Sequence, residues 1–170
     1  MNIEDLNVLD RVSFVEAIGW VFERSPWVAE RAWASRPFPE VGALHSAMVA
    51  QVESATPEEQ LQLLCAHPDL GTRARMMAAS AGEQSGAGLD RLAPDEFEHL
   101  HSLNMRYRAK FGFPFLYAVK GGSKYDVLQA LERRLSASEM DEHREALRQV
   151  YRIAEFRLQD AINKGDAQTE

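Results

Sequence analysis

The feature that most constrains the fold is a long, uninterrupted helical pattern towards the C-terminal end of the chain. Between Ser138 and Lys164 apolar residues recur at intervals of three and four, and neither proline nor glycine occurs among them. This spacing predicts one long amphipathic helix. Its apolar stripe comprises Leu147, Val150, Tyr151, Ala154, Leu158 and Ile162. A helix of this kind must bury its stripe against other elements, so the rest of the chain has to supply a packing surface.

The remaining sequence supplies that surface as further helices. Three stretches in the first third carry helix-start signals, namely SFVE at 13–16, SPWVAE at 25–30 and TPEE at 56–59. A helix is also expected from about residue 94 to residue 110, and another is expected to begin near Ser123. These patterns predict an all-α protein.

One short stretch departs from the helical pattern, and nothing divides the chain. Residues 113–119, FPFLYAV, are extended in character, but Pro114 makes them a poor interior strand. No linker, repeat or low-complexity segment separates one part of the sequence from another. We therefore predict one single-domain helical bundle spanning residues 1–170.

Composition limits the possible partners and compartments. The chain of 170 residues is 45% hydrophobic, which suffices for one sizeable core, and its formal net charge is -7. Since the basic residues are scattered, we expect no nucleic acid partner. No stretch is apolar and long enough for a membrane span, and the first residues do not resemble a signal peptide. A single cysteine, Cys65, agrees with a reducing compartment, so we expect a cytoplasmic protein.

The segment CAHPDLG, residues 65–71, places a histidine where a helix should stop. Proline disfavours helix in the residue before it, so the helix is expected to end at about His67. An imidazole held there could exchange protons with a substrate near neutral pH. Taken alone, however, a histidine at a helix end is more often a cap or a partly buried structural group.

Other polar residues occur where packing alone would not favour them. SAGEQSG at 80–86 could bind a polar ligand or could merely cap a helix, and the two interpretations are equally supported. Asn104 falls inside the apolar stripe of its helix, so its amide must find partners in the core or at a pocket wall. No metal site is evident, because His67 and Asp69 are too close in sequence to indicate one and His99 and His101 face two sides of one helix.

Arg157 is the most ambiguous of these polar residues. A helical projection puts it at the margin of the apolar stripe of the last helix, beside Val150 and Ala161. A guanidinium at the edge of a core is either a surface group with a buried stem or the anion clamp of a pocket. Periodicity alone does not separate these two interpretations.

Taken together, four stretches closely resemble one known family. They are HPDLG at 67–71, SAGEQSGAGLDRL at 80–92, LNMRYRAKFGFPFLYAV at 103–119 and IAEFRLQD at 153–160. The order and content of these motifs resemble the OHCU decarboxylases, which act on 2-oxo-4-hydroxy-4-carboxy-5-ureidoimidazoline (OHCU). FERSPWVAERAW and RPF near the start extend the resemblance over almost the whole chain.

The resemblance implies an all-helical, homodimeric enzyme that completes the conversion of urate to S-allantoin without a metal or an organic cofactor. His67 matches the family's catalytic histidine, and Glu83 matches a second residue expected to take part. The residues that match the family's substrate contacts are Pro68, Ser80, Glu83, Gln84, Phe115, Leu116, Tyr117, Ala118, Val119 and Arg157. Glu83 would either orient His67 or hydrogen-bond the ureido group of the substrate.

The chemistry of this substrate explains why a cofactor is not required. Its carboxylate sits on a ring carbon next to a C=N group, so the electrons left by departing CO2 can flow into that imine.

Two other classes of function stay open from the residues alone. A hydrolase of cyclic ureides would use similar polar residues but usually needs a metal-activated water, and a noncatalytic helical binding module would show the same caps and stripes.

Overall fold

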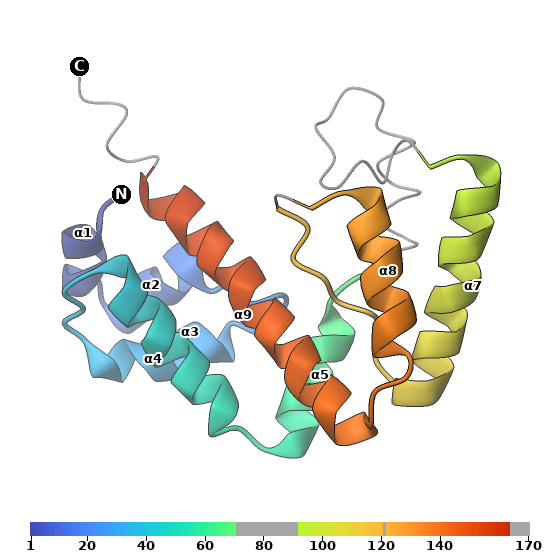
Figure 1. Cartoon of the computed structure of the whole chain (residues 1–170). Helices are drawn as coiled ribbons and strands as arrows, with labels where there is room; N and C mark the ends of the chain where they lie inside the picture. The colour runs from blue at the N-terminus through green and yellow to red at the C-terminus, as the bar shows by residue number, and fades with distance from the viewer. Residues whose placement is uncertain (71–91, 121, 164–170) are drawn as a thin grey trace. The chain divides into compact units, whose positions relative to one another are not determined.

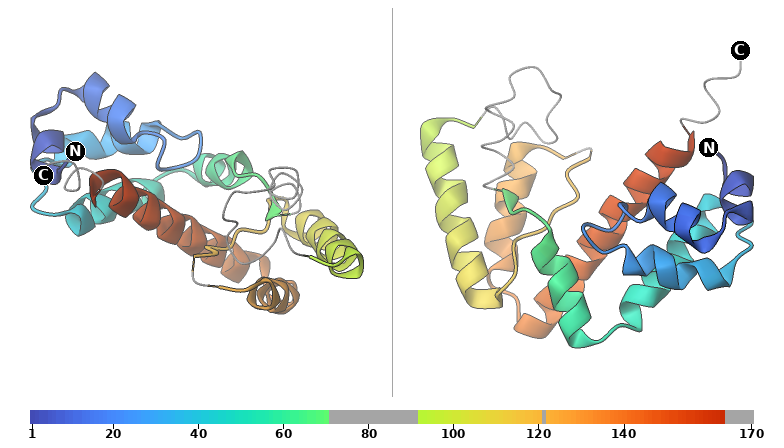
Figure 2. Two further views of the ribbon diagram at one scale, coloured as in Figure 1. Left: turned by 90° about the horizontal axis from the view of Figure 1, so that it is seen from above. Right: turned by 180° about the vertical axis from the view of Figure 1, so that it is seen from behind.

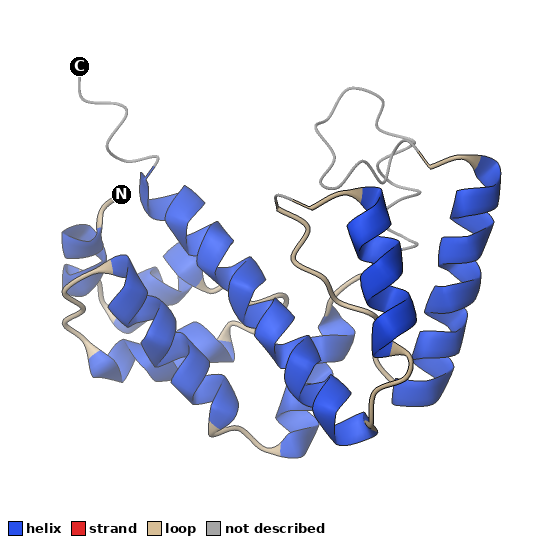
Figure 3. Cartoon of the chain, viewed as in Figure 1, coloured by secondary structure: helices blue, strands red, loops and turns tan. Residues whose placement is uncertain are grey.

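The computed structural model describes residues 1–70, 92–120 and 122–163, and in these ranges every assigned element is helical (Figures 1 and 3). The chain divides into two compact units. One comprises Met1–Ala66 together with the chain from Val150 onward, and the other comprises His67–Gln149. The prediction of an all-α fold is confirmed, whereas the prediction of a single domain stays a prediction.

The first unit contains five short or medium helices and one 3-10 turn. It also contains the second half of the long helix α9. These elements are α1 (Ile3–Val8), α2 (Arg11–Ile18), α3 (Trp27–Ala32), η1 (Trp33–Ser35), α4 (Val41–Glu53), α5 (Pro57–Ala66) and α9 (Glu139–Asn163). The bounds of α9 agree with the helix predicted from residue 138 to residue 164. Its apolar stripe is buried in this unit at Val150, Ala154, Leu158 and Ile162.

The core of the first unit combines these α9 residues with the inner faces of the shorter helices. Phe14, Leu44 and Met48 are fully buried, as the helical spacing of their segments requires. His45 Nε2 lies 2.8 Å from the carbonyl oxygen of Tyr151, so a polar contact also links α4 to α9. Burial of the stripe therefore accounts for the long helix in this unit.

Two of the predicted helix starts in this unit differ from the structure, by three residues at α2 and by one residue at α3. The side chain of Asp10 accepts a hydrogen bond of 2.9 Å from the backbone N–H of Ser13, so α2 begins before the predicted SFVE box. Ser25 does not cap α3, because its hydroxyl donates to the carbonyl of Glu23 and the helix begins only at Trp27. At α2 a nearby carboxylate is better placed to cap the helix than the predicted serine, whereas at α3 no side chain caps the helix.

The third predicted start is confirmed at α5. The backbone N–H of Glu59 donates to Thr56 Oγ1 at 3.2 Å, and the backbone N–H of Thr56 donates to Glu59 Oε1 at 3.3 Å. This reciprocal pair is a capping box, with Pro57 at the first helical position. The sequence TPEE thus sets the start of the helix that leads to His67.

The second unit contains α7 (Pro94–Phe111), α8 (Lys124–Arg134) and the first half of α9, with an irregular segment between α7 and α8. The helices α7 and α8 lie side by side (Figure 2). Gly112 ends α7 in the left-handed conformation, at φ 79°, and Ser123 caps α8 through Asp126. The bounds of α7 agree with the prediction, and α8 begins where a helix start was predicted. No helix in the described ranges is long and apolar enough to cross a membrane.

Candidate active site

His67 follows directly on the last residue of α5, as the sequence HPD predicts. The helix ends at Ala66, and His67 as a residue is only 6% exposed, whereas the next residue, Pro68, is exposed. A titratable imidazole is thus held at a helix end with little access to solvent. This placement suits a group that exchanges protons with a bound molecule.

Three of the predicted site residues lie outside the described residues. They are Ser80, Glu83 and Gln84 of the segment SAGEQSG. Their expected contacts with the substrate and with His67 therefore stay predictions.

Residues 115–119, which are predicted to contact the substrate, lie in the second unit, in the part of the chain that connects α7 to α8. We call this segment the wall. Phe115, Leu116 and Ala118 are buried, whereas Tyr117 and Val119 are partly exposed. The ring of Tyr107 on α7 packs edge-on against Phe115, with ring centroids 5.3 Å apart. Aromatic contact therefore fixes the start of the wall against α7.

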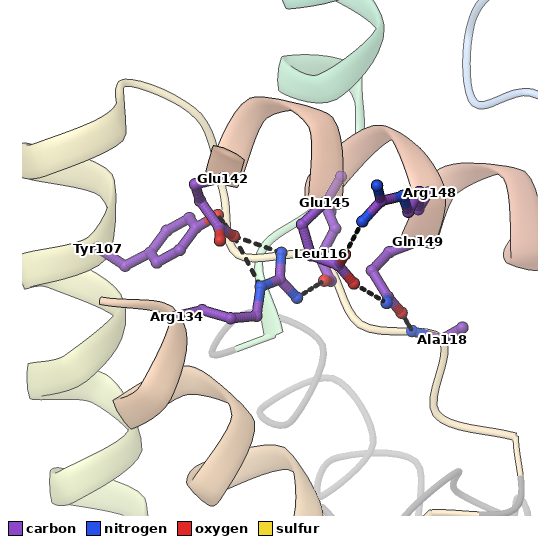
Figure 4. A network of polar contacts seen from close by, with 8 residues as sticks. All are labelled: Tyr107, Leu116, Ala118, Arg134, Glu142, Glu145, Arg148 and Gln149. Atoms are coloured by element: carbon purple, nitrogen blue, oxygen red, sulfur yellow. Dashed lines mark hydrogen bonds and ion pairs between the residues drawn. The ribbon is translucent and has the colours of Figure 1, made fainter. Parts of the chain in front are cut away.

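Side chains from α8 and α9 hold the backbone of this wall (Figure 4). Arg134 Nη1 donates a hydrogen bond of 2.6 Å to the carbonyl oxygen of Leu116. The backbone N–H of Ala118 donates to Gln149 Oε1 at 2.9 Å. Both side chains are buried, so the hydrogen bonds are shielded from competition with water.

A buried polar cluster supports Arg134. Its Nε donates to Glu142 Oε1 at 2.7 Å, and the hydroxyl of Tyr107 donates to the same oxygen. Burial, together with this hydrogen bond to an anionic partner, raises the pKa of Tyr107. The phenol therefore stays neutral and keeps its proton for Glu142.

The sequence analysis missed Arg134, Glu142 and Gln149. A signal for Arg134 exists, because the buried residues of α8 follow a spacing of three, four and seven that includes it. They are Val127, Ala130, Leu131 and Arg134. A charged residue in an apolar stripe indicates a buried partner. The anionic partner of Arg134, Glu142, lies on α9, so no pattern within α8 predicts it.

Arg157 lies in the first unit and contacts the segment between α2 and α3. Its Nη2 is 2.8 Å from Glu23 Oε2, and its Nη1 donates to the carbonyl oxygen of Val21 at 3.1 Å. The side chain is 30% exposed, in agreement with its predicted place at the stripe margin. The guanidinium is therefore oriented by a carboxylate that the sequence analysis did not identify.

The structure brings His67 and residues 115–119 into one unit and Arg157 into the other. Among the described residues, no three His, Cys, Asp or Glu side chains cluster closely enough to hold a metal ion. One hollow of about 390 Å³ lies beside the junction of α8 and α9. All of its lining residues except Ala137 are charged, and none of the predicted site residues belongs to it.

Comparisons with known proteins agree with the resemblance found in the motifs. The family model described as OHCU decarboxylase matches residues 7–159. A 2-oxo-4-hydroxy-4-carboxy-5-ureidoimidazoline decarboxylase of Haloferax volcanii is 50% identical over 163 residues, which cover 96% of this chain and 97% of the relative. A protein of the same name from Halalkalicoccus jeotgali is 45% identical over 170 residues, covering 100% of this chain and 97% of the relative.

Solved structures give the same result. A crystal structure of (S)-allantoin synthase matches with a TM-score of 0.78 and 34% identity, covering 95% of this chain and 54% of that one. A crystal structure of OHCU decarboxylase in the presence of (S)-allantoin matches with a TM-score of 0.63 and 21% identity, covering 81% of this chain and 91% of that one, and supports the fold alone. The family match extends over nearly the whole chain, and the chain belongs to the OHCU decarboxylase family.

Proposed function

We propose that the chain decarboxylates OHCU to S-allantoin and CO2, the last step of urate degradation. The observation that carries this proposal is the family match over residues 7–159, which includes the buried His67 at the end of α5. Relatives that match 96% or more of this chain, at 45% and 50% identity, bear the name of this decarboxylase. The activity is that of a carboxy-lyase.

His67 is the proposed proton-transfer group. Loss of CO2 leaves an electron pair that the adjacent imine accepts, so the reaction needs a proton removed from the substrate hydroxyl or delivered to the ring. A neutral imidazole carries a proton on one ring nitrogen and a lone pair on the other, so it can do either. Glu83 is proposed to orient His67 or to bind the ureido group.

The other family-matched residues are proposed to bind the substrate. Backbone groups of residues 115–119, the ring of Pro68 and the polar side chains of Ser80 and Gln84 would surround the ring and the ureido group. Arg157 would hold the carboxylate or the ring oxygens, because a guanidinium presents two parallel donors to such groups. Holding the carboxylate out of the ring plane aligns the breaking bond with the imine.

The test is to oxidise urate enzymatically in the presence of the purified chain and to follow CO2 release and the circular dichroism of the product. We expect accelerated CO2 release and S-allantoin, whereas spontaneous decay gives the racemate. His67→Asn should abolish the acceleration, and the same substitution at the exposed His101 should not. A fully active His67→Asn variant would remove His67 from the mechanism.

The same assay separates the alternative functions. A noncatalytic binding module would leave the rate and the racemic product unchanged. A metal-dependent hydrolase of cyclic ureides would release no CO2 and would lose its activity after dialysis against a chelator, whereas the proposed decarboxylase needs no metal or organic cofactor.

A cytoplasmic location and a homodimer are also proposed. Cell fractionation tests the location, and analytical ultracentrifugation tests the oligomeric state.

A further inference from the structure

We infer that Gln149 is a positioning residue, which fixes the backbone of residues 115–119 at the geometry that substrate binding requires. This inference rests on the proposed function of that segment as a wall of the active site. Gln149 itself lies on α9, and its proposed role requires no contact with the substrate.

The amide of Gln149 is buried and uses both of its ends. The side chain belongs to a residue that is only 7% exposed. Its Oε1 accepts the backbone N–H of Ala118 at 2.9 Å, and its Nε2 donates to Glu145 Oε1 at 2.8 Å (Figure 4). Glu145 Oε2 in turn accepts a hydrogen bond of 2.9 Å from Arg148 Nη1. The chain of contacts therefore runs from the protein surface to the wall.

The charge of Glu145 determines which way the amide points. Burial acts to raise the pKa of Glu145, but hydrogen bonds from Gln149 and Arg148 and the positive charges of Arg134 and Arg148 together outweigh it, and the pKa is lowered overall. An ionised carboxylate only accepts hydrogen bonds, so it selects the NH2 end of Gln149. The carbonyl end of the amide is then aimed at Ala118.

A second contact holds the wall two residues earlier. Arg134 Nη1 donates to the carbonyl oxygen of Leu116, and its guanidinium lies over the ring of Phe115, 4.4 Å from the centroid. In an extended chain the backbone groups of alternate residues point to the same side. The groups of Leu116 and Ala118 thus face α8 and α9, and those of Tyr117 between them are left for the opposite side.

The side chains of the wall support this extended geometry. The rings of Phe115 and Tyr117 are nearly parallel, at 13°, with centroids 6.3 Å apart. Stacking of residues i and i+2 is expected when both side chains leave an extended chain on the same face. The peptide groups of Tyr117 offer one donor and one acceptor, which suit the N–H and C=O groups of a cyclic ureide.

Gln149 is the better residue to test than Arg134. Arg134 belongs to a buried ion pair, and its loss would lower stability before any effect on substrate could be measured. Gln149→Leu keeps the volume and removes both hydrogen bonds. Arg148→Leu is the matched control, because it removes the other contact of Glu145 from an exposed position and leaves Gln149 bound to Oε1.

The experiment measures steady-state rates together with hydrogen exchange of the Ala118 amide. We expect Gln149→Leu to lower kcat/KM by roughly 10- to 100-fold, since small misplacements near a reacting substrate have effects of this order. The Ala118 amide should exchange faster in this variant. Arg148→Leu should stay within about twofold of the wild type in both measurements.

A double variant in which positions 145 and 149 exchange their side chains tests whether the hydrogen bond to Ala118 can be restored. In Glu145→Gln/Gln149→Glu the new glutamine donates to the new glutamate, whose second oxygen still accepts the Ala118 N–H. We expect this double variant to recover protection and most of kcat/KM, whereas Gln149→Glu alone brings two carboxylates together and should not. If Gln149→Leu does not fold, the comparison of the double variant with Gln149→Glu decides the matter.

The measurements distinguish a failure of this inference from a failure of the proposed function. Faster exchange at Ala118 with an unchanged kcat/KM in Gln149→Leu would overturn the positioning role while the wild type remained an active decarboxylase. An inactive wild type would overturn the proposed function, and with it the assignment of Gln149 to a substrate wall. Equal losses in Arg148→Leu and Gln149→Leu would also overturn the inference.

Discussion

Arg134 and Glu142 form a buried ion pair that joins the end of α8 to the start of α9, and their residues are only 5% and 1% exposed. Tyr107 donates a further hydrogen bond to the same carboxylate. Burying two charges is costly, so the pair stabilises the fold only while both partners are present. The ion pair holds the guanidinium of Arg134 in the position from which it donates a hydrogen bond to the carbonyl oxygen of Leu116.

Breaking this pair should strongly destabilise the protein. We expect Arg134→Leu to lower the free energy of unfolding by about 3–5 kcal/mol, because Glu142 is then left buried without its cation. The double variant Arg134→Leu/Glu142→Leu should recover much of the loss, since no charge remains unpaired. Urea unfolding followed by circular dichroism measures both. Losses that simply add in the double variant would mean that the two charges are not coupled.

Asn104 provides a second test of stability. It is 8% exposed, and neither its amide nitrogen nor its amide oxygen has a hydrogen-bond partner among the described residues. Such partners were expected from the sequence, and the described residues do not supply them. A buried amide without partners costs about 1–3 kcal/mol, so we expect Asn104→Leu to leave the free energy of unfolding unchanged or to raise it.

Asn7→Leu is the matched control for Asn104. The amide of Asn7 donates to the carbonyl of Phe38 and accepts the backbone N–H of the same residue, both at 2.8 Å. Its removal should lower the unfolding free energy by about 1–3 kcal/mol. An equal loss on Asn104→Leu would indicate that the Asn104 amide is satisfied in the folded protein.

The elements that the sequence predicted well are those set by local patterns. Helical spacing gave α7 and α9 nearly to the residue, and the capping box at Thr56 fixed the start of α5. The start of α2 was missed because Asp10 and Ser13 both suit an N-cap, and only the folded backbone decides between them.

The candidate site was predictable only in part. HPD indicates that a helix ends beside His67, and this follows from proline alone. The partners Glu23 and Gln149 were not predictable, because each meets its contact from a distant part of the sequence. Their residue types are ordinary on a helix or in a turn, so burial and tertiary contact alone reveal their roles.

His143 should make stability depend on pH. It lies on α9, with its ring edge-on to Phe113, and burial lowers its pKa below the usual 6.5. As pH falls through about 6.5, the unfolded chain therefore binds a proton at this site before the folded protein does, and the free energy of unfolding decreases. His143→Leu should reduce this pH dependence between pH 5 and 7, measured as urea midpoints. An unchanged dependence would assign the effect to other groups.

The last prediction concerns Arg157, whose guanidinium is paired with Glu23 and bound to the carbonyl of Val21. If it also clamps the substrate, lysine cannot replace its planar pair of donors, and Arg157→Lys should lower turnover by at least about tenfold. The pair with Glu23 is partly exposed on both sides, so its loss should lower the free energy of unfolding by no more than about 1 kcal/mol.

Glu23→Gln separates the two roles of Arg157. This variant loses the ion pair but keeps the guanidinium, so its stability should fall by about as much as in Arg157→Lys, at most ~1 kcal/mol. Its turnover should stay close to that of the wild type if the substrate is held by the remaining donors. Initial rates against freshly generated OHCU and melting temperatures of the two variants provide the comparison. Equal stability losses with wild-type turnover in both would show that Arg157 only anchors the segment between α2 and α3, and that the substrate carboxylate is held by another cation.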